Sequence, residues 1–126
     1  MELDKLDVYQ IARELSKIGW NIYKGMKSEH RSSIGQQFIK GIDSIGANIA
    51  EGFGRYHFLD SVKFYYNARG PVWESKHWTE LLYERGLIAE ETYKQLSDKP
   101  NTLGIKLNNF VSSIKSKATT NKSLSK

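Results

Sequence analysis

A run of apolar residues in the middle of the chain constrains the fold more than any other feature. Its members recur at spacings of four, three and four, which places them on one face of a helix: Phe38, Ile42, Ile45 and Ile49. Beside this face lie residues with little or no side chain: Gly46, Ala47 and Ala50. Small residues let a neighbouring helix approach closely, so we expect this helix to be the most tightly packed element. Gly52 and Gly54 are expected to end it by adopting the left-handed conformation of a C-terminal cap.

Three further helices are predicted from apolar residues that recur every three or four positions. They cover residues 4–25, residues 56–85 and the segment that begins near residue 89. No strand pattern is evident in the sequence. Helices of this length with short connections predict an all-α fold, an up-down-up-down antiparallel four-helix bundle.

Finer details of these helices also follow from the pattern. In the third helix, one predicted apolar face is formed by Leu59, Val62, Tyr66, Trp73, His77 and Leu81, and a second by Phe58, Tyr65 and Val72. A helix that is apolar on two sides is either central or shared between subunits. Asp4 is the predicted cap of the first helix. Residues 27–32 are predicted to form a loop, after which Ser32 or Ser33 would cap the second helix.

Two prolines and a polar C-terminal stretch define the expected irregularities. Pro71 removes a backbone donor inside the third helix, which predicts a kink near Gly70. Pro100 predicts a fourth helix that is bent or broken. We therefore expect residues 1–116 to form the bundle and residues 117–126 to form a basic, disordered tail.

Length and composition limit the class of protein. A chain of 126 residues forms one domain and can bury a core without additional cross-links. It has no cysteine, which excludes disulfides and thiolate sites. Its N-terminus is too polar for a signal peptide, and no apolar run approaches the ~20 residues of a membrane span. We expect a soluble, cytoplasmic protein that does not contact a membrane.

Positive charge is concentrated near the C-terminus. Residues 99–126 carry six lysines and no acid, whereas the net charge of the whole chain is +5. Lysines without acids attract phosphates, which predicts contacts with a nucleic-acid backbone through Lys106, Lys115, Lys117 and Lys122. The alternative is a solvated helix end, stabilised by cations near its negative pole.

Two motifs resemble those of a known family. The first is Ser44-Ile45-x-x-Asn48-Ile49-Ala50-Glu51-Gly52-x-Gly54-Arg55. The second consists of Asp60, Phe64, Ala68-Arg69-Gly70, Trp73 and Glu74. Together they resemble the signature of the 23S ribosomal RNA intervening-sequence protein family, over residues 6–114. The departures are Pro71 in place of a usual serine, Gly46 where proline is common, and His57 near a usual serine.

The resemblance implies more than the residues show by themselves. It implies a four-helix bundle that assembles into a homo-oligomeric ring, a pentamer. The family is related to the accessory variability determinant of diversity-generating retroelements. That relation implies nucleic acid and a reverse transcriptase as partners.

One pair of residues has the spacing of a metal site. Glu74 and His77 form a Glu-x-x-His motif, and Glu51 could add a carboxylate. Di-iron bundles need this motif twice, and the sequence contains no second copy. We therefore expect no metal, no cofactor and no catalytic residue, because no nucleophile has an adjacent base either.

Several charged and amide residues accompany the apolar face of the second helix and its neighbour. They are Asn48, Glu51, Arg55, Arg69 and Glu74. We interpret them as a buried polar network between helices, in which each charge is paired. An active-site cluster or a ligand pocket is the alternative.

Three functions follow from these observations. The first is a non-catalytic homo-oligomer that associates with nucleic acid through its cationic C-terminal end. The second is a structural or adaptor oligomer with a protein partner such as a reverse transcriptase. The third, an enzyme with a site around Glu51 and Glu74, has the least support. Aromatic residues outside the apolar faces, such as Trp20 and Trp78, are expected at subunit contacts.

Overall fold

The protein is built from helices. The computed structural model describes residues 2–55 and 57–124, with side chains up to residue 118, and contains no strand within these ranges. The four long helices are α1 (Asp7–Gly25), α3 (Gln36–Phe53), α4 (Phe58–Glu84) and α5 (Glu90–Leu124). Three short elements complete the order: η1 (Leu3–Lys5), α2 (Ser28–His30) and the π-helical turn η2 (Arg31–Gly35). The prediction of an all-α four-helix bundle is confirmed.

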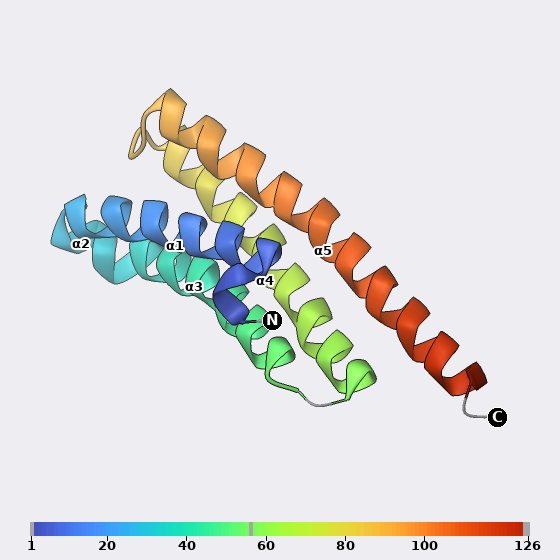
Figure 1. The fold of residues 1–126 in the computed structure, drawn as a ribbon. Helices are drawn as coiled ribbons and strands as arrows, with labels where there is room; N and C mark the ends of the chain where they lie inside the picture. The colour runs from blue at the N-terminus through green and yellow to red at the C-terminus, as the bar shows by residue number, and fades with distance from the viewer. Residues whose placement is uncertain (1, 56, 125–126) are drawn as a thin grey trace.

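The long helices pack around a common interior. α3 contacts both α1 and α4, while α5 closes the bundle by contacting α4 and α1. Figure 1 shows each long helix running back along the preceding one, with the C-terminal end of α5 extending beyond the others. Because α5 lies against two helices, it contributes to two separate surface seams, one with α1 and one with α4.

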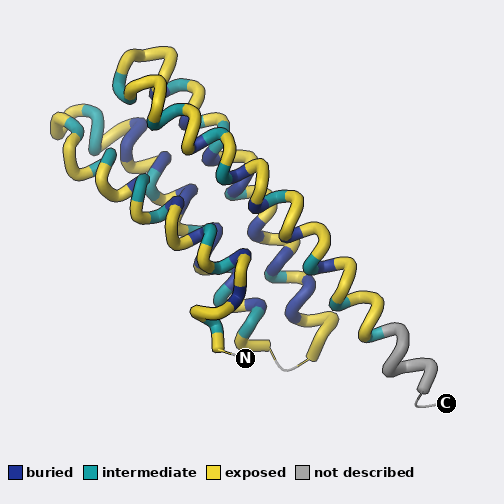
Figure 2. Tube along the Cα trace, turned by 45° about the horizontal axis from the view of Figure 1, so that its top comes forward, coloured by how far each residue is buried: buried dark blue, intermediate teal, exposed yellow. Residues whose placement is uncertain are grey.

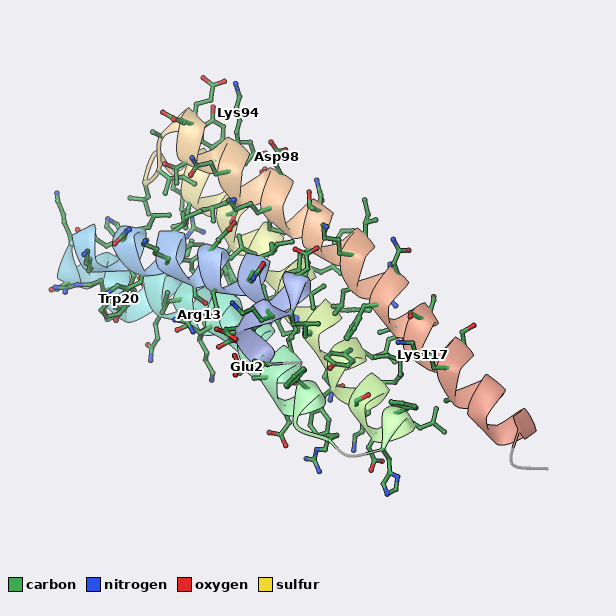
Figure 3. All side chains as sticks on the ribbon, viewed as in Figure 1. Glu2, Arg13, Trp20, Lys94, Asp98 and Lys117 are labelled. Carbon is green, nitrogen blue, oxygen red and sulfur yellow. The ribbon has the colours of Figure 1, made fainter. Side chains whose placement is uncertain are left out.

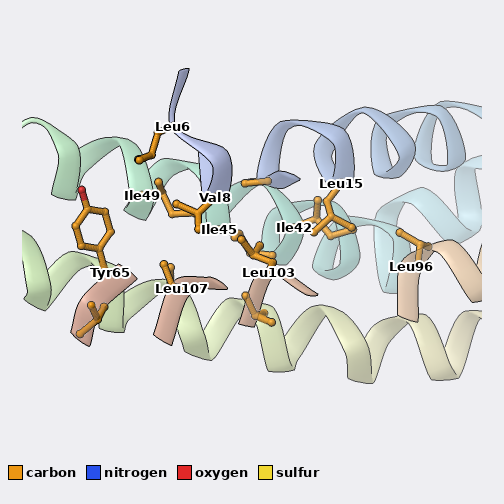
Figure 4. Close-up of a cluster of buried hydrophobic side chains, with 14 of the residues drawn as sticks. Leu6, Val8, Leu15, Ile42, Ile45, Ile49, Tyr65, Leu96, Leu103 and Leu107 are labelled. Atoms are coloured by element: carbon orange, nitrogen blue, oxygen red, sulfur yellow. The ribbon is translucent and has the colours of Figure 1, made fainter. Parts of the chain in front are cut away.

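The predicted apolar face of α3 forms the centre of the core. Phe38, Ile42, Ile45 and Ile49 are all buried. Leucines from the facing helices meet them, including Leu15 of α1 and Leu103 and Leu107 of α5 (Figure 4). Figure 2 shows buried residues along the inner faces of the helices and exposed residues on the outside. Full burial of each such side chain contributes about 1.5–3 kcal/mol.

The two glycines at the end of α3 act differently from the prediction. Gly54 has φ −76°, and Gly86 (φ 71°) is the one described residue with a positive φ of this kind. Gly52 instead allows α3 to approach α4 closely. A Cβ atom there would lie 2.9 Å from Cε1 of Tyr65 and 3.0 Å from the Ser61 carbonyl oxygen. Burial at this contact raises the pKa of Tyr65 to about 12.

The predicted caps of the first two helices are wrong, whereas the fourth long helix, predicted to begin near residue 89, begins at Glu90. Asp4 lies in η1, and α1 begins at Asp7 with no side-chain cap. Residues 28–32 form α2 and the start of η2 rather than a loop, and Lys27 precedes them in extended conformation. The Ser33 hydroxyl donates to the Glu29 carbonyl oxygen at 2.8 Å, so it bonds backward along the chain and caps nothing. The non-helical backbone of Ser33 (φ −123°, ψ −106°) makes the turn into α3.

Both prolines lie inside continuous helices. Pro71 is within α4 and Pro100 within α5, so the alternative of a broken fourth helix is wrong. Pro100 is buried. The kink near Gly70 and the bend at Pro100 stay predictions.

The predicted tail, residues 117–126, begins within α5, which runs to Leu124. Residues 125–126 lie outside the described part of the chain, and the boundary at 116/117 stays a prediction. No helix among the described residues is both long and apolar enough to cross a membrane.

Candidate nucleic-acid interface

The residues predicted to form a buried network lie mostly at the surface. Glu51 and Arg55 are exposed and pair with each other at 2.6 Å between Oε1 and Nη2. Asn48 is half-buried, and its Nδ2 donates to the Ser44 carbonyl oxygen of its own helix at 2.9 Å. Arg69 and Glu74 are exposed on α4. The prediction of a buried network is therefore wrong for the four charged residues, which are exposed, and the hydrogen bond of half-buried Asn48 stays within α3.

The metal motif does not assemble a site. Glu74 Oε1 accepts a hydrogen bond from Nε1 of Trp78 at 3.2 Å, within α4. His77 is exposed, and its ring meets that of Trp78 edge to face at 4.9 Å. Among the described residues, no three histidines or carboxylates converge as metal ligands.

The seam between α1 and α5 neutralises two of the C-terminal lysines. Lys99 Nζ lies 2.8 Å from Oε2 of Glu14, and Lys106 Nζ lies 2.6 Å from Oδ2 of Asp7. Glu14 and Asp7 are 85 and 99 positions away in sequence. Lys106, a predicted nucleic-acid contact, is thus held by a carboxylate on the neighbouring helix.

The other predicted lysines lie further along α5. Lys115 donates from Nζ to the Tyr66 hydroxyl of α4 at 2.5 Å, and the same Nζ lies 4.7 Å from the Tyr66 ring centroid. Lys117 is exposed near the projecting end of α5 (Figure 3). The side chain of Lys122 lies outside the described residues. Three of the four predicted lysines therefore lie on the part of α5 beyond the α1 ion pairs, two of them with described side chains.

A stripe on α4 was not anticipated as a binding surface. Its members alternate aromatic and cationic residues at spacings of three, four and three: Tyr66, Arg69, Trp73 and Lys76. Lys76 Nζ lies 4.3 Å from the Trp73 ring centroid, and the Arg69 guanidinium carbon lies 5.9 Å from that of Tyr66. Cations at such distances are attracted by the ring faces. These contacts link neighbouring side chains of the stripe along the outside of the bundle.

The alternation of aromatic and cationic residues is visible in the sequence, but the same positions were interpreted by their apolar periodicity. Tyr66 and Trp73 were predicted on one of two apolar faces, and both are exposed. The core face of α4 includes Tyr65 and Val72 of the second predicted face, together with Ala68 and Ser75. The interleaving of aromatic and cationic residues at helical spacing would have indicated a surface rather than a core.

A groove of about 450 Å³ lies between this stripe and α5. Its lining consists of Arg69, Val72, Trp73, Lys76, Pro100, Asn101, Gly104, Ile105 and Asn108. Lys76 spans the groove and donates from Nζ to Oδ1 of Asn101 at 2.6 Å. The lining contains two cations and two amides but no carboxylate.

The carboxylate on the next turn of the α4 stripe is also engaged. Glu80 Oε1 accepts a hydrogen bond from the Tyr93 hydroxyl at 2.5 Å. This hydrogen bond raises the pKa of Tyr93. Glu80 keeps its negative charge but does not line the groove, so the absence of carboxylates holds for the groove lining alone.

Residues 4–109 match the 23S rRNA-intervening sequence protein family. The chain belongs to this family. The match includes both motifs that suggested the resemblance, so that prediction is confirmed for the family. The link to the accessory variability determinant stays a prediction. Comparison with curated proteins gives no match.

A solved structure shares the fold of this family member. It is a crystal structure of a protein with unknown function from the S23 ribosomal protein family of Bacteroides thetaiotaomicron VPI-5482. The two chains are 23% identical, with a TM-score of 0.76, and the alignment covers 82% of this chain and 97% of the other. At this identity the likeness shows the fold alone. The family match and the neighbour both fit an all-helical protein.

Proposed function

We propose that this protein is a non-catalytic homo-oligomer that binds a nucleic-acid backbone through the C-terminal end of α5. The observation that carries the proposal is that carboxylates of α1 pair with lysines at the start of this segment, whereas other lysines lie further along α5. Residues 99–126 contain six lysines and no acid, and α1 supplies carboxylates to Lys99 and Lys106. Beyond these pairs, Lys115 donates to the Tyr66 hydroxyl as one of its interactions, and Lys117 is exposed. Lys122 is expected to extend this cationic end.

Assembly would make a weak cationic end effective. A few lysines on one chain give little affinity, whereas several copies held together multiply it. Trp20, which is 53% exposed on α1, supports a contact between copies. Trp78 packs partly against the core of its own chain and contributes less to that argument. The pentamer that the family resemblance implies is the assembly we propose.

Binding and assembly are tested together. The mass in solution should be a multiple of 14.5 kDa by light scattering. A labelled RNA strand should bind with an affinity that falls steeply with salt, because each phosphate contact adds about −0.7 to −0.9 to the log–log slope. A Lys115→Gln, Lys117→Gln variant should bind more weakly and with a shallower slope. Lys99→Gln, Lys106→Gln is the matched control and should bind like the unchanged protein.

An adaptor function is the second candidate. Phe58 and Leu59, at the start of α4, are 45% and 68% exposed, which suits a protein partner such as a reverse transcriptase. An oligomer that shows no salt-dependent binding to RNA or DNA would contradict the first proposal and favour the adaptor.

A further inference from the structure

Trp73 is presented to solvent in a fixed position. The residue is 65% exposed, although it lies in the middle of α4. Lys76 covers one face of the indole at 4.3 Å and is itself held by Asn101 of α5 at 2.6 Å. An ordered indole with one accessible face provides a flat stacking surface for another aromatic ring.

The groove beside Trp73 has the size and surface of a site for a small planar group. Its volume of about 450 Å³ falls within the range of small-molecule pockets. Val72, Pro100 and Ile105 give it apolar surface. Gly104 leaves it open, because a Cβ atom there would meet no heavy atom within 4 Å.

Charge at the groove favours an anion. Arg69 and Lys76 are cationic, Asn101 and Asn108 supply neutral amides, and no acid lines the groove. Lys115 lies beyond Arg69, since both contact the Tyr66 ring. A ligand that combines a flat aromatic group with regularly spaced negative charges would meet both features.

We propose that this groove is a subsite for single-stranded nucleic acid, in which an unpaired base stacks on Trp73. The phosphates on either side of that base lie against Arg69 and Lys76, and the strand continues toward Lys115. The inference rests on the proposed binding of nucleic acid and adds a preference for unpaired strands. Bases in a duplex are already stacked and paired, so they cannot enter the groove.

Trp20 provides a matched comparison on another helix. It is also an exposed tryptophan, and the shallow pocket beside it has a similar volume of about 440 Å³. That pocket is lined by Glu14 and Asp43 as well as by basic residues. The acids make it a poor site for phosphates, so Trp20 is the control for an exposed indole without the charge.

The test compares three probes of equal length: an oligothymidine strand, an abasic strand with the same phosphates, and a duplex. The unchanged protein should bind the oligothymidine strand most tightly. Trp73→Ala should weaken that binding roughly five- to 150-fold, the range for loss of one stacked base, and leave the abasic strand unaffected. Gly104→Leu should produce the same pattern by filling the groove, in a helix where leucine is favoured over glycine. Trp20→Ala lies at a proposed contact between copies, so the control is a ratio: it should leave the affinity for the oligothymidine strand relative to the abasic strand unchanged.

Three other results would contradict the proposed subsite. Equal affinity for the oligothymidine and abasic strands would be consistent with binding through the backbone and would contradict stacking of a base on Trp73. A change in oligomer mass on Trp73→Ala, with a parallel loss for both strands, would make the groove a contact between copies. Failure of the unchanged protein to bind any probe would overturn the proposed function, and the subsite with it.

Discussion

The two seams of α5 handle positive charge in opposite ways. Toward α1, lysines meet carboxylates, as in the pairs of Lys99 with Glu14 and Lys106 with Asp7. Toward α4, Lys115 meets the ring and hydroxyl of Tyr66. A carboxylate offsets the charge of the lysine it pairs with, whereas a phenol hydroxyl or an aromatic ring carries no charge of its own. The net charge of a segment therefore does not tell which of its lysines can bind phosphate.

The largest loss of affinity is expected when the cations of the α4 seam are removed. A triple variant of the α4 seam, Arg69→Gln, Lys76→Gln, Lys115→Gln, should lose affinity for a single strand on the order of a hundredfold, at about 1 kcal/mol for each charged contact. The α1 seam offers the control, Lys99→Gln, Lys106→Gln. Fluorescence anisotropy at two salt concentrations measures both. Similar losses in the two variants would show that the seams are equivalent.

A steric variant separates stability from binding. Gly52→Ala places a Cβ atom against Tyr65 and Ser61, so it should destabilise the fold by about 1–2 kcal/mol through overpacking. Gly54→Ala, where the nearest atoms are 3.6 Å away, should be neutral or slightly stabilising. Urea unfolding measures both. A folded Gly52→Ala protein that binds normally would show that losses in the seam variants do not come from reduced stability.

The smallest expected effect comes from the ion pairs. Asp7→Asn and Glu14→Gln each break a pair whose side chains are partly exposed, so each should cost roughly 0.2–1 kcal/mol of stability. Neither should weaken binding to a nucleic acid. A loss of several kcal/mol in urea unfolding would mean that the α1 seam holds the bundle together.

The sequence predicted the fold well because the fold depends on apolar periodicity. The face from Phe38 to Ile49 is buried as expected. Helix caps were predicted poorly, since Ser33 has a cap-like side chain that bonds backward to Glu29 instead. Gly52 is required for a close contact with α4 rather than for a left-handed turn. Helix propensity depends on the local sequence and gives no information about such contacts between helices.

The surface was predicted less well, for a related reason. Lys106 and Asp7 are 99 positions apart, so a count of charges along the segment could not pair them. Glu51 and Glu74 were placed inside because they adjoin the apolar faces, but one helical position of difference turns a side chain outward. Trp73 was placed on one of two apolar faces of its helix, and apolar periodicity did not tell which of the two faces the core. Ser75 occupies the buried position nearby, since a small residue lets α4 and its neighbours pack closely.

Tryptophan fluorescence tests the central claim most directly, since the chain has three tryptophans that can be reduced to one. A Trp20→Phe, Trp78→Phe protein retains Trp73, and a Trp73→Phe, Trp78→Phe protein retains Trp20. Each is titrated with an oligothymidine strand at low and high salt. Emission from Trp73 should be quenched as the strand binds and recover as salt releases it, while emission from Trp20 stays constant. Unchanged Trp73 emission in a protein that still binds the strand, or quenching of Trp20 instead, would contradict the account.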